Sequence, residues 1–281
     1  MIKIENAISE TLLIPLYMKY RASQQANPIL IDPAACRLVP QIDYDFAKFD
    51  RAKPTLIGTA IRARYFDQLT ADFIRRQSRP VVVILGCGLD SRRERIGSTA
   101  DGVPFYQLDL EDVIQWRRAI LPPQSNETLI AASAFDTEWM DELHARHPDA
   151  QFLFVIEGVL MYFSNDMVRG LFQDLAARFH GSEIAFDMCN SWTVKNSARH
   201  DAMKYVSARF ESFCDNEREP EQWADNLHFI SNRYIVGDFP AEWKRIGFVS
   251  SLIMRLVRVI RESSRMLHYR IETFAKFPRI P

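Results

Sequence analysis

Hydrophobic residues near the start of the chain follow a helical rhythm. Within residues 55–77 an apolar side chain returns at every fourth position, which is the spacing of one face of a helix. These positions are Ile57, Ile61, Tyr65, Leu69 and Phe73. Residues 6–24 also suit a helix, and no strand is evident in this stretch. The pattern therefore predicts N-terminal helices over residues 1–79.

The pattern changes at residue 80, where short apolar runs begin to alternate with helical segments. Residues 81–85 (VVVIL) are mostly β-branched, which is typical of a strand buried on both faces. Further strands are predicted at 105–108, 129–132, 152–156 and 184–186, and helices at 112–121, 138–145 and 166–179. Strands that alternate with helices predict a parallel sheet with crossover helices, hence an α/β fold.

The last third of the chain has a less regular pattern. Residues 192–232 mix aromatic and charged side chains and are predicted to form helices that cover the open end of the sheet. A short amphipathic helix is predicted at 242–247, and the last two strands at 249–259 and 269–277. With no repeat and no linker, we expect one continuous domain. Its parts would be the helices at 1–79, a ligand-binding core at 80–190, a substrate cover at 191–240 and the last strands at 241–281.

Composition narrows the class of protein. The 281 residues are 47% hydrophobic and 25% charged, as in an ordinary folded protein. A formal net charge of −1 gives no general attraction to nucleic acid, so no nucleic-acid partner is expected. The four cysteines are widely spaced and indicate free thiols in a reducing compartment. No apolar run is long enough to cross a bilayer and no basic leader is evident, so a cytoplasmic protein without an integral membrane segment is expected.

The most informative segment is a glycine turn after the first predicted strand. Gly86 and Gly88 stand where a Rossmann-type sheet binds its nucleotide, and a side chain there would keep the backbone away from the ligand. A helix is expected to begin near Ser91, and its N–H groups would favour an anion. Asp109 follows Gly88 by 21 residues, at the position of a ribose-binding carboxylate. A lone Gly-x-Gly is often only a tight turn, but the three features together favour an adenosine-containing ligand.

Four sequence blocks follow one another in order along the chain. They are GTAIRARYFD at 58–67, LGCGLDSR at 85–92, YQLDLEDVI at 106–114 and IEGVLMYF at 156–163. Each block alone is modest, whereas four in order with sensible spacing are specific. Together they resemble the leucine carboxyl methyltransferase family, in particular its bacterial branch named for the tetracenomycin polyketide O-methyltransferase. The resemblance covers roughly residues 11–190, with a weaker echo at 243–247.

The resemblance implies a Rossmann-like class I methyltransferase sheet, mostly parallel with seven strands, and S-adenosylmethionine as the methyl donor. It also assigns the cofactor-binding residues. Gly86 and Gly88 would line the amino-acid end of the donor, and Glu157 would lie close to its methionine moiety. Asp109 would hold the ribose, and Asp136 would lie near the adenine. Arg62, with Arg64 as an alternative, would pair with the donor's carboxylate.

Structural roles compete with several of these assignments. Arg62 could be a surface arginine, Glu157 part of a structural salt bridge, and Asp136 a helix cap. The run of arginines at 92–95 is expected to be a solvated helix face, and the pair His144 and His147 lacks a third ligand, so no metal site is predicted. Basic residues at 255–265 have helical spacing, which fits a solvated face or a surface that contacts a partner or a membrane.

The acceptor is less defined than the donor. A carboxylate needs no general base at neutral pH, whereas a phenol benefits from one, and Tyr162, His200 and His228 are weak catalytic candidates. Aromatic residues of the cover could line an aromatic-accepting pocket, or could pack the cover on the sheet. These are Trp192, Tyr205, Phe210, Phe213, Trp223 and Phe229.

The leading hypothesis is an S-adenosylmethionine-dependent O-methyltransferase of secondary metabolism. It would methylate a carboxyl or phenolic hydroxyl group of a small, polyketide-like molecule. One alternative is a nicotinamide-dependent oxidoreductase on the same sheet, which is disfavoured because Ser91 replaces the third glycine of the dinucleotide fingerprint. The other is a non-catalytic, methyltransferase-like binding protein.

Overall fold

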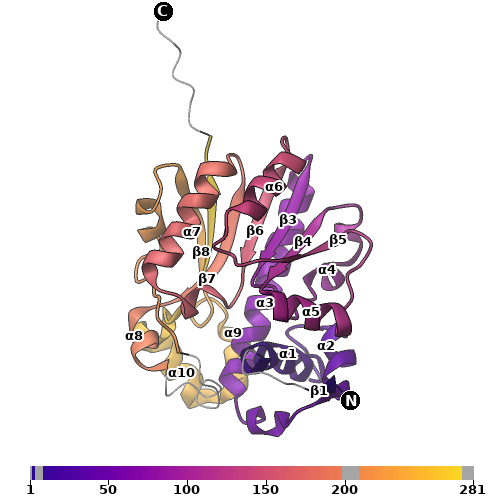
Figure 1. Ribbon diagram of the computed structural model, residues 1–281. Coiled ribbons are helices and arrows are strands. Elements are labelled where there is room, and N and C mark those ends of the chain that lie inside the picture. The colour runs from indigo at the N-terminus through magenta and orange to yellow at the C-terminus, as the bar shows by residue number, and fades with distance from the viewer. Residues whose placement is uncertain (1, 4–8, 198–208, 274–281) are drawn as a thin grey trace, which may run out of the picture.

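A seven-stranded sheet forms the centre of the molecule in the computed structural model, which describes residues 2–3, 9–197 and 209–273 (Figure 1). The strand order is β5-β4-β3-β6-β7-β9-β8. The five strands from β5 to β7 pair in parallel, whereas β9 runs antiparallel to both β7 and β8. Their bounds are β3 (Pro80–Leu85), β4 (Phe105–Asp109), β5 (Glu127–Ala131), β6 (Gln151–Ile156), β7 (Glu183–Cys189), β8 (Leu227–Tyr234) and β9 (Ser264–Ile271). The predicted mostly parallel sheet of seven strands is confirmed.

Helices cover both faces of this sheet, as predicted (Figure 1). They are α1 (Ser9–Ser23), α2 (Pro33–Leu38), α3 (Lys53–Arg76), α4 (Arg92–Arg95), α5 (Glu111–Ile120), α6 (Glu138–Arg146), α7 (Asn165–Arg178), α8 (Ser191–Lys195), α9 (Pro240–Trp243), α10 (Phe248–Leu256) and α11 (Arg258–Arg261). Short 3-10 turns are η1 (Val39–Gln41), η2 (Phe46–Phe49), η3 (Gly97–Ala100), η4 (Leu160–Tyr162), η7 (Glu219–Gln222) and η8 (Lys244–Ile246). None of the described helices combines the length and the apolar character that a membrane span requires.

Strand β3 shows why its sequence is apolar throughout. Val82 and Ile84 pack into a core shared with α1 and α3, whereas Val81 and Val83 pack into a second core shared with α6 and α7. Successive side chains of a strand point to opposite faces, so a strand covered on both faces needs an apolar residue at every position. The long helix α3 packs on one of these faces, with Arg62 close to Glu157 after the end of β6 and Arg76 close to Glu183 at the start of β7.

Two predictions for the last third of the chain were wrong. Residues 249–259 form parts of α10 and α11 rather than a strand, because their apolar residues recur with helical spacing although many are β-branched. Strand β8 lies within the segment that was expected to be helical cover, and among the described residues β9 alone falls in the last part of the chain. Strand β8 is an edge strand with one buried and one largely exposed face, which weakens its hydrophobic signal.

A smaller correction concerns the first eighty residues. Helices α1 and α3 match the predicted N-terminal helices, but β1 (Ile2–Lys3) and β2 (Ile42–Asp43) form a short parallel pair where no strand was expected. Residues 274–277 of the predicted final strand lie outside the described part of the chain. All four cysteines are free, in agreement with the expectation of unpaired thiols.

A buried carboxylate joins three elements at the start of β7. Glu183 accepts hydrogen bonds from Arg76 of α3 at 3.0 and 3.1 Å and contacts His268 of β9 at 2.7 Å. Burial opposes ionisation of Glu183, but His268 and Arg76 outweigh it and lower its pKa to about 2. The carboxylate therefore favours the folded state when it is ionised.

We expect Glu183→Gln to lower the free energy of unfolding at neutral pH. The folded-state pKa of about 2 lies below the ordinary value of 4.5, so this contribution is present above pH 4.5 and is lost as the pH falls toward 2. Urea unfolding between pH 7 and 3 should show a weaker pH dependence in the variant. Glu142→Gln, at an exposed position of α6, is the control. An unchanged pH profile in Glu183→Gln would contradict this role.

Candidate active site

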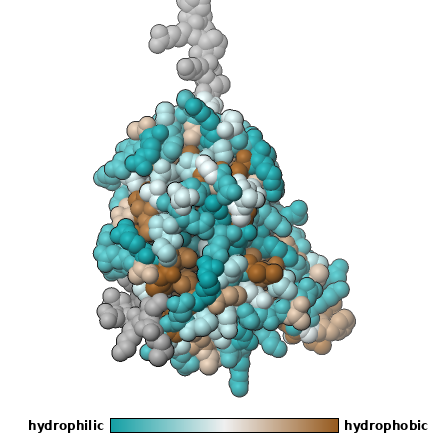
Figure 2. All heavy atoms as spheres, turned by 90° about the vertical axis from the view of Figure 1, so that its right-hand side faces the viewer, coloured by the Kyte–Doolittle hydropathy of each residue, from teal (hydrophilic) through white to brown (hydrophobic). Residues whose placement is uncertain are grey.

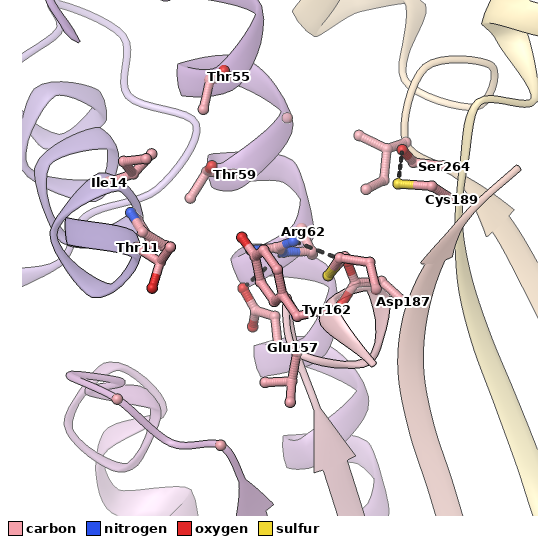
Figure 3. A pocket seen from close by; sticks show the side chains of 18 of the residues that line it. Thr11, Ile14, Thr55, Thr59, Arg62, Glu157, Tyr162, Asp187, Cys189 and Ser264 are labelled. Atoms are coloured by element: carbon pink, nitrogen blue, oxygen red, sulfur yellow. Dashed lines mark hydrogen bonds and ion pairs between the residues drawn. The ribbon is translucent and has the colours of Figure 1, made fainter. Parts of the chain in front are cut away.

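A cavity of about 890 Å³ opens at the carboxyl ends of the parallel strands (Figure 3). Gly86, Asp109, Glu157 and Asp187 line it from the ends of β3, β4, β6 and β7 or the turns that follow them. Helices α1 and α3 close one side. In open α/β sheets this edge is where ligands bind, because the strand order reverses there and leaves a crevice.

The glycine turn at the end of β3 has the conformation that its sequence predicts. Gly86 and Gly88 have φ angles of +64° and +45°. A Cβ on Gly86 would lie 2.5 Å from Cγ2 of Val159, so glycine is required by packing as well as by φ. Helix α4 begins at Arg92, close to the expected position, but is only a single turn.

Asp109 holds the glycine turn from the neighbouring strand. Its two carboxylate oxygens accept hydrogen bonds from the backbone N–H groups of Gly88 and Leu110, each at 2.8 Å. Burial raises the pKa of Asp109, while the two backbone donors act in the opposite direction. Each carboxylate oxygen can accept a further hydrogen bond, so the group is suited to a ligand diol.

Arg62, Glu157 and Asp187 form a buried ionic cluster inside the cavity (Figure 3). Arg62 Nε lies 3.1 Å from Glu157 Oε1, and Arg62 Nη1 lies 2.8 Å from Asp187 Oδ2. Asp187 also accepts a hydrogen bond from the Gly158 N–H at 2.6 Å. A Cβ on Gly158 would lie 2.8 Å from Arg62 Nη2, so this glycine makes room for the guanidinium.

Burial and charge act in opposite directions on the cluster. Burial disfavours the Arg62 cation, but Asp187 and Glu157 outweigh it and raise the pKa of Arg62. Burial likewise opposes ionisation of Glu157, yet Arg62 and Arg92 lower its pKa. For Asp187 burial prevails and raises the pKa, despite the contact with Arg62. Asp187 is thus the carboxyl group of the cluster that most readily takes up a proton.

The cavity has two sides of different chemistry. The charged side comprises Lys19, Arg62, Asp90, Asp109, Glu157 and Asp187, from α1, α3 and the strand ends. The chain after β7 contributes a group of apolar lining residues, here called the apolar side: Trp192, Phe210, Ile235, Val236, Trp243, Met254 and Ile260. Further apolar residues, among them Leu12, Ile14 and Leu16 of α1, also line the cavity. Two molecules bound side by side would suit this division, one of them with charged groups and the other uncharged.

Comparison with known proteins decides the family. The sequence pattern of the leucine carboxyl methyltransferase family matches residues 16–176, more than half of the chain. The chain belongs to this family. It is 28% identical over 273 residues to the tetracenomycin polyketide synthesis O-methyltransferase TcmP of Streptomyces glaucescens, covering 93% of this chain and 96% of that protein. It is 26% identical to the S-adenosyl-L-methionine-dependent methyltransferase dpfgK of Gibberella zeae, over 88% of each chain.

Solved structures support the same fold. A crystal structure of a Thermobifida fusca protein assigned as a methyltransferase matches with a TM-score of 0.57, at 15% identity over 96% of both chains. A Streptomyces avermitilis protein of the duf574 family matches with a TM-score of 0.56 at 12% identity, over 92% of this chain and 96% of that one. These two structures show the fold of a class I methyltransferase. The family match and the named relatives show an S-adenosylmethionine-dependent methyltransferase, which sets aside the oxidoreductase alternative.

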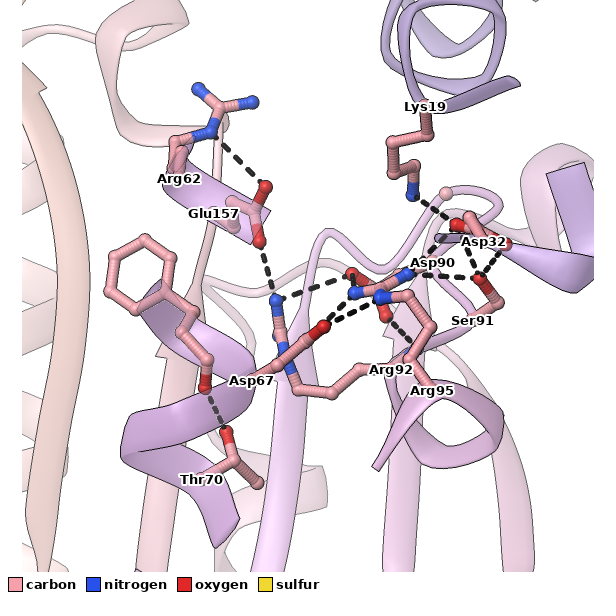
Figure 4. Close-up of polar contacts among 12 residues, drawn as sticks. Lys19, Asp32, Arg62, Asp67, Thr70, Asp90, Ser91, Arg92, Arg95 and Glu157 are labelled. Atoms are coloured by element: carbon pink, nitrogen blue, oxygen red, sulfur yellow. Dashed lines mark hydrogen bonds and ion pairs between the residues drawn. The ribbon is translucent and has the colours of Figure 1, made fainter. Parts of the chain in front are cut away.

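A second ionic network joins the cavity lining through Glu157 (Figure 4). Arg92, fully buried, bonds Asp67 of α3 at 3.0 Å and also contacts Glu157. Arg95 bonds Asp67 at 2.7 Å and Asp32, the cap of α2, at 3.0 Å. The prediction of a solvated arginine face was wrong, because each buried guanidinium finds carboxylates on neighbouring elements.

Two charged residues of the cavity, Asp187 and Lys19, were not singled out from the sequence. Asp187 lies within β7, and a carboxylate inside an otherwise apolar strand was the available signal. Lys19 lies on α1, is only 5% exposed and stands 3.7 Å from Asp32. A single lysine among apolar residues of a predicted helix was the corresponding signal, since a buried cation needs a partner or a ligand.

The other two cofactor-binding candidates, Arg64 and Asp136, are described but are not among the residues that line the cavity. Arg64 forms an ion pair with Glu242 instead. Asp136 is exposed in the turn after β5 and accepts a hydrogen bond from the Ser133 N–H at 3.0 Å. Its contact with adenine stays a prediction.

Of the three catalytic candidates, one lines the cavity, one lies elsewhere on the sheet and one is outside the described residues. Tyr162 lines the cavity, and burial raises its pKa to about 12. His228 lies on edge strand β8 next to Glu272 at 3.6 Å, away from the cavity lining. His200 and Tyr205 fall outside the described residues.

The aromatic residues of the cover divide between the cavity and the core. Trp192 and Phe210 line the cavity. Trp223 packs against Phe172, and Phe229 against Tyr269, so these two have a packing role. Phe213, whose N–H donates to Asn165, is not among the lining residues. Trp243 lines the cavity although the sequence did not single it out.

The predicted pair His144 and His147 has no shared ligand geometry. His147 Nε2 is hydrogen-bonded to the Tyr106 hydroxyl at 2.7 Å, and His144 is exposed. Within the described part of the chain, no group of three histidine, cysteine, aspartate or glutamate side chains is arranged to hold a metal ion.

We expect Gly86→Ala to destabilise the protein and weaken binding of S-adenosylmethionine. An alanine with a φ of +64° is strained by about 1–3 kcal/mol, and its Cβ would lie 2.5 Å from Val159. Urea unfolding and calorimetric titration measure the two effects. Gly170→Ala in α7 is the matched control, because its Cβ meets no atom within 4 Å and a helix gains about 0.5–1 kcal/mol from the change. Unaltered donor affinity in Gly86→Ala would remove the turn from the binding site.

Proposed function

We propose that the protein is an O-methyltransferase that methylates the carboxylate of a small, apolar molecule. The observation that carries this proposal is the division of one cavity into a charged side at the strand ends and an apolar side built by later elements. The charged side suits the donor, whose amino-acid and ribose parts are polar. The apolar side suits the body of the acceptor.

The residues of the charged side match the groups of S-adenosylmethionine. Lys19 and Arg62 would hold its carboxylate, Glu157 and Asp187 its amino group, and Asp109 its ribose hydroxyls. Each charged group of the donor would thus face a side chain of opposite charge. Arg62 already pairs with Glu157 and Asp187, so positive and negative side chains are both present in the site. Gly86 and Gly88 line the cavity beside these groups, so the donor would approach the backbone of the turn there.

The donor, when bound, supplies a methyl group on a positively charged sulfur. The chain's own contribution is to hold the acceptor oxygen in line with that methyl group and to keep water out. Transfer breaks the carbon–sulfur bond, whose electrons stay on sulfur, and forms a carbon–oxygen bond. Trp192, Phe210 and Trp243 on the apolar side suit both tasks, since they exclude water and restrict the acceptor's orientation.

A carboxylate is the favoured acceptor group because it needs no base. The described residues of the apolar side include neither a histidine nor a carboxylate. Burial keeps the pKa of Tyr162 near 12, so its hydroxyl stays neutral at physiological pH. An acceptor that is already ionised at neutral pH fits such surroundings.

A phenolic hydroxyl is the second candidate acceptor. It is favoured by the aromatic residues Trp192, Phe210 and Trp243 of the lining. The likeness to TcmP supports a role in secondary metabolism, and the four free cysteines support a reducing, cytoplasmic location.

We expect Asp109→Asn to raise the dissociation constant for S-adenosylmethionine about tenfold to a hundredfold. The physical reason is the loss of a charged acceptor, which contributes about 1.5–3 kcal/mol to a hydrogen bond. Calorimetric titration with S-adenosylmethionine and S-adenosylhomocysteine measures the effect, and NADH should not bind. Asp149→Asn is the control because Asp149 is exposed and pairs only with Arg79 among the described residues. Equal affinities in the two variants would exclude Asp109 from the donor site.

A second experiment identifies the acceptor group. Apolar aromatic molecules that carry a carboxyl group, a phenolic hydroxyl or neither are incubated with methyl-labelled donor. Labelled methyl esters are cleaved by mild base, whereas methyl ethers survive it. We expect base-labile product from the carboxylic acids and none from the molecules that lack both groups. Base-stable product from the phenols alone would replace the carboxylate proposal with the phenol proposal.

A further inference from the structure

Helices α10 and α11 expose an unusual set of apolar side chains. Their exposed fractions range from 36% for Val259 to 82% for Phe248, and no residue of either helix is fully buried. The set, here called the α10–α11 surface, comprises Phe248, Val249, Leu252, Ile253, Leu256, Val257 and Val259. By contrast, the face of the molecule in Figure 2 is mostly hydrophilic, with hydrophobic residues in small separate patches.

The exposed residues of α10 share one face. At about 100° per residue, Phe248, Val249, Leu252, Ile253 and Leu256 fall within an arc of roughly 140°. Met254 points away from this arc and lines the cavity, as does Ile260 of α11. The two helices therefore form a thin wall with the apolar side of the cavity behind it and solvent in front.

The segment around this surface is strongly basic. Between Lys244 and Arg261 the sequence contains five cations and no acidic residue, although the whole chain has a net charge of −1. The cations are Lys244, Arg245, Arg255, Arg258 and Arg261. Glu262, the first acid that follows, pairs with Arg258 and Arg261 at 3.1 and 3.0 Å. Positive charge thus frames an exposed apolar arc.

A tryptophan extends the surface toward the cavity mouth. Trp192 of α8 is 43% exposed and also lines the cavity. Asn190, the cap of α8, donates hydrogen bonds to the carbonyl oxygens of Val259 and Glu262 at 2.9 and 3.2 Å, so α8 and α11 are fixed side by side. Tryptophan is enriched where one part of a protein meets lipid and another meets water.

We propose that the α10–α11 surface docks the enzyme on an anionic lipid surface. The apolar arc would enter the boundary between headgroups and acyl chains, and the cations would lie among anionic headgroups. A two-fold contact between two copies fits less well, because it would set the same basic segment against itself. Lipid also explains the position beside the apolar side of the cavity, since an apolar acceptor dissolves in it.

Vesicle co-sedimentation without substrate tests this docking, so its result does not depend on the proposed function. The vesicles contain phosphatidylcholine alone or a two-to-one mixture with phosphatidylserine. We expect sedimentation with the mixture, weakened by high salt and by the absence of phosphatidylserine. In Lys244→Gln/Arg255→Gln the partition coefficient should fall about twenty-five-fold, because each cation contributes about fivefold. Phe248→Ser/Leu256→Ser should lower it at least about tenfold.

Two matched double variants separate docking from general charge and hydrophobicity. Arg75→Gln/Arg79→Gln removes two exposed cations elsewhere, and Met167→Ser/Ile230→Ser removes two exposed apolar side chains elsewhere. Both should sediment like the unaltered protein, and all four variants should bind S-adenosylmethionine normally. Failure of the unaltered protein to bind mixed vesicles overturns the proposal. So does a dimer in analytical ultracentrifugation that Phe248→Ser/Leu256→Ser dissociates, since the surface would then be an interface between copies.

Discussion

The position of Glu157 between two arginines is the interaction on which the rest of the site depends. One carboxylate oxygen faces Arg62 of α3 and the other faces Arg92 of α4 (Figure 4). A buried carboxylate without partners would be costly, and so would either buried arginine alone. Each of Glu157, Arg62 and Arg92 therefore depends on the others for charge compensation. Their contacts hold α3 against the ends of β3 and β6. Asp67 and Asp187 complete the compensation of charge, on α3 and β7. A ligand that enters this cluster exchanges partners with groups that are already held in place.

This arrangement explains why a single cavity contains two chemistries. The charges are concentrated where the parallel strands end, because only there can carboxylates from several strands meet the arginines of α3 and α4. Among the described residues after β7, those that line the cavity include no ionisable group. In the proposed function, the charged residues that would bind the donor and the later apolar residues that would surround the acceptor thus come from different parts of the sequence. Substitutions in the later part can alter the acceptor without disturbing the ionic cluster.

The sequence predicts those features that depend on neighbours along the chain. Strand β3, the turn at Gly86 and the carboxylate at Asp109 follow one another within one unit, and all three lie where expected. Asp187 and Lys19 were missed because their partners are distant in sequence and only the fold brings them together. Arg92 was taken for a solvated residue for the same reason. Helix α10 was mistaken for a strand because β-branched residues dominated over helical spacing, and β8 was missed because an edge strand carries a weak apolar pattern.

Helix α10, which was predicted as a strand, also carries most of the proposed docking surface. Its apolar residues are numerous enough to suggest a buried strand, yet most of them face solvent. A soluble domain gains nothing in folding from such exposure, so another environment has to account for it. Met254, on the opposite side of the helix, faces the cavity. One short helix therefore borders the apolar side of the cavity and, in the proposed docking, the lipid surface from which an apolar acceptor would come. In this arrangement the wall of the active site and the docking surface are the same element, and a change in either affects how the acceptor reaches the donor.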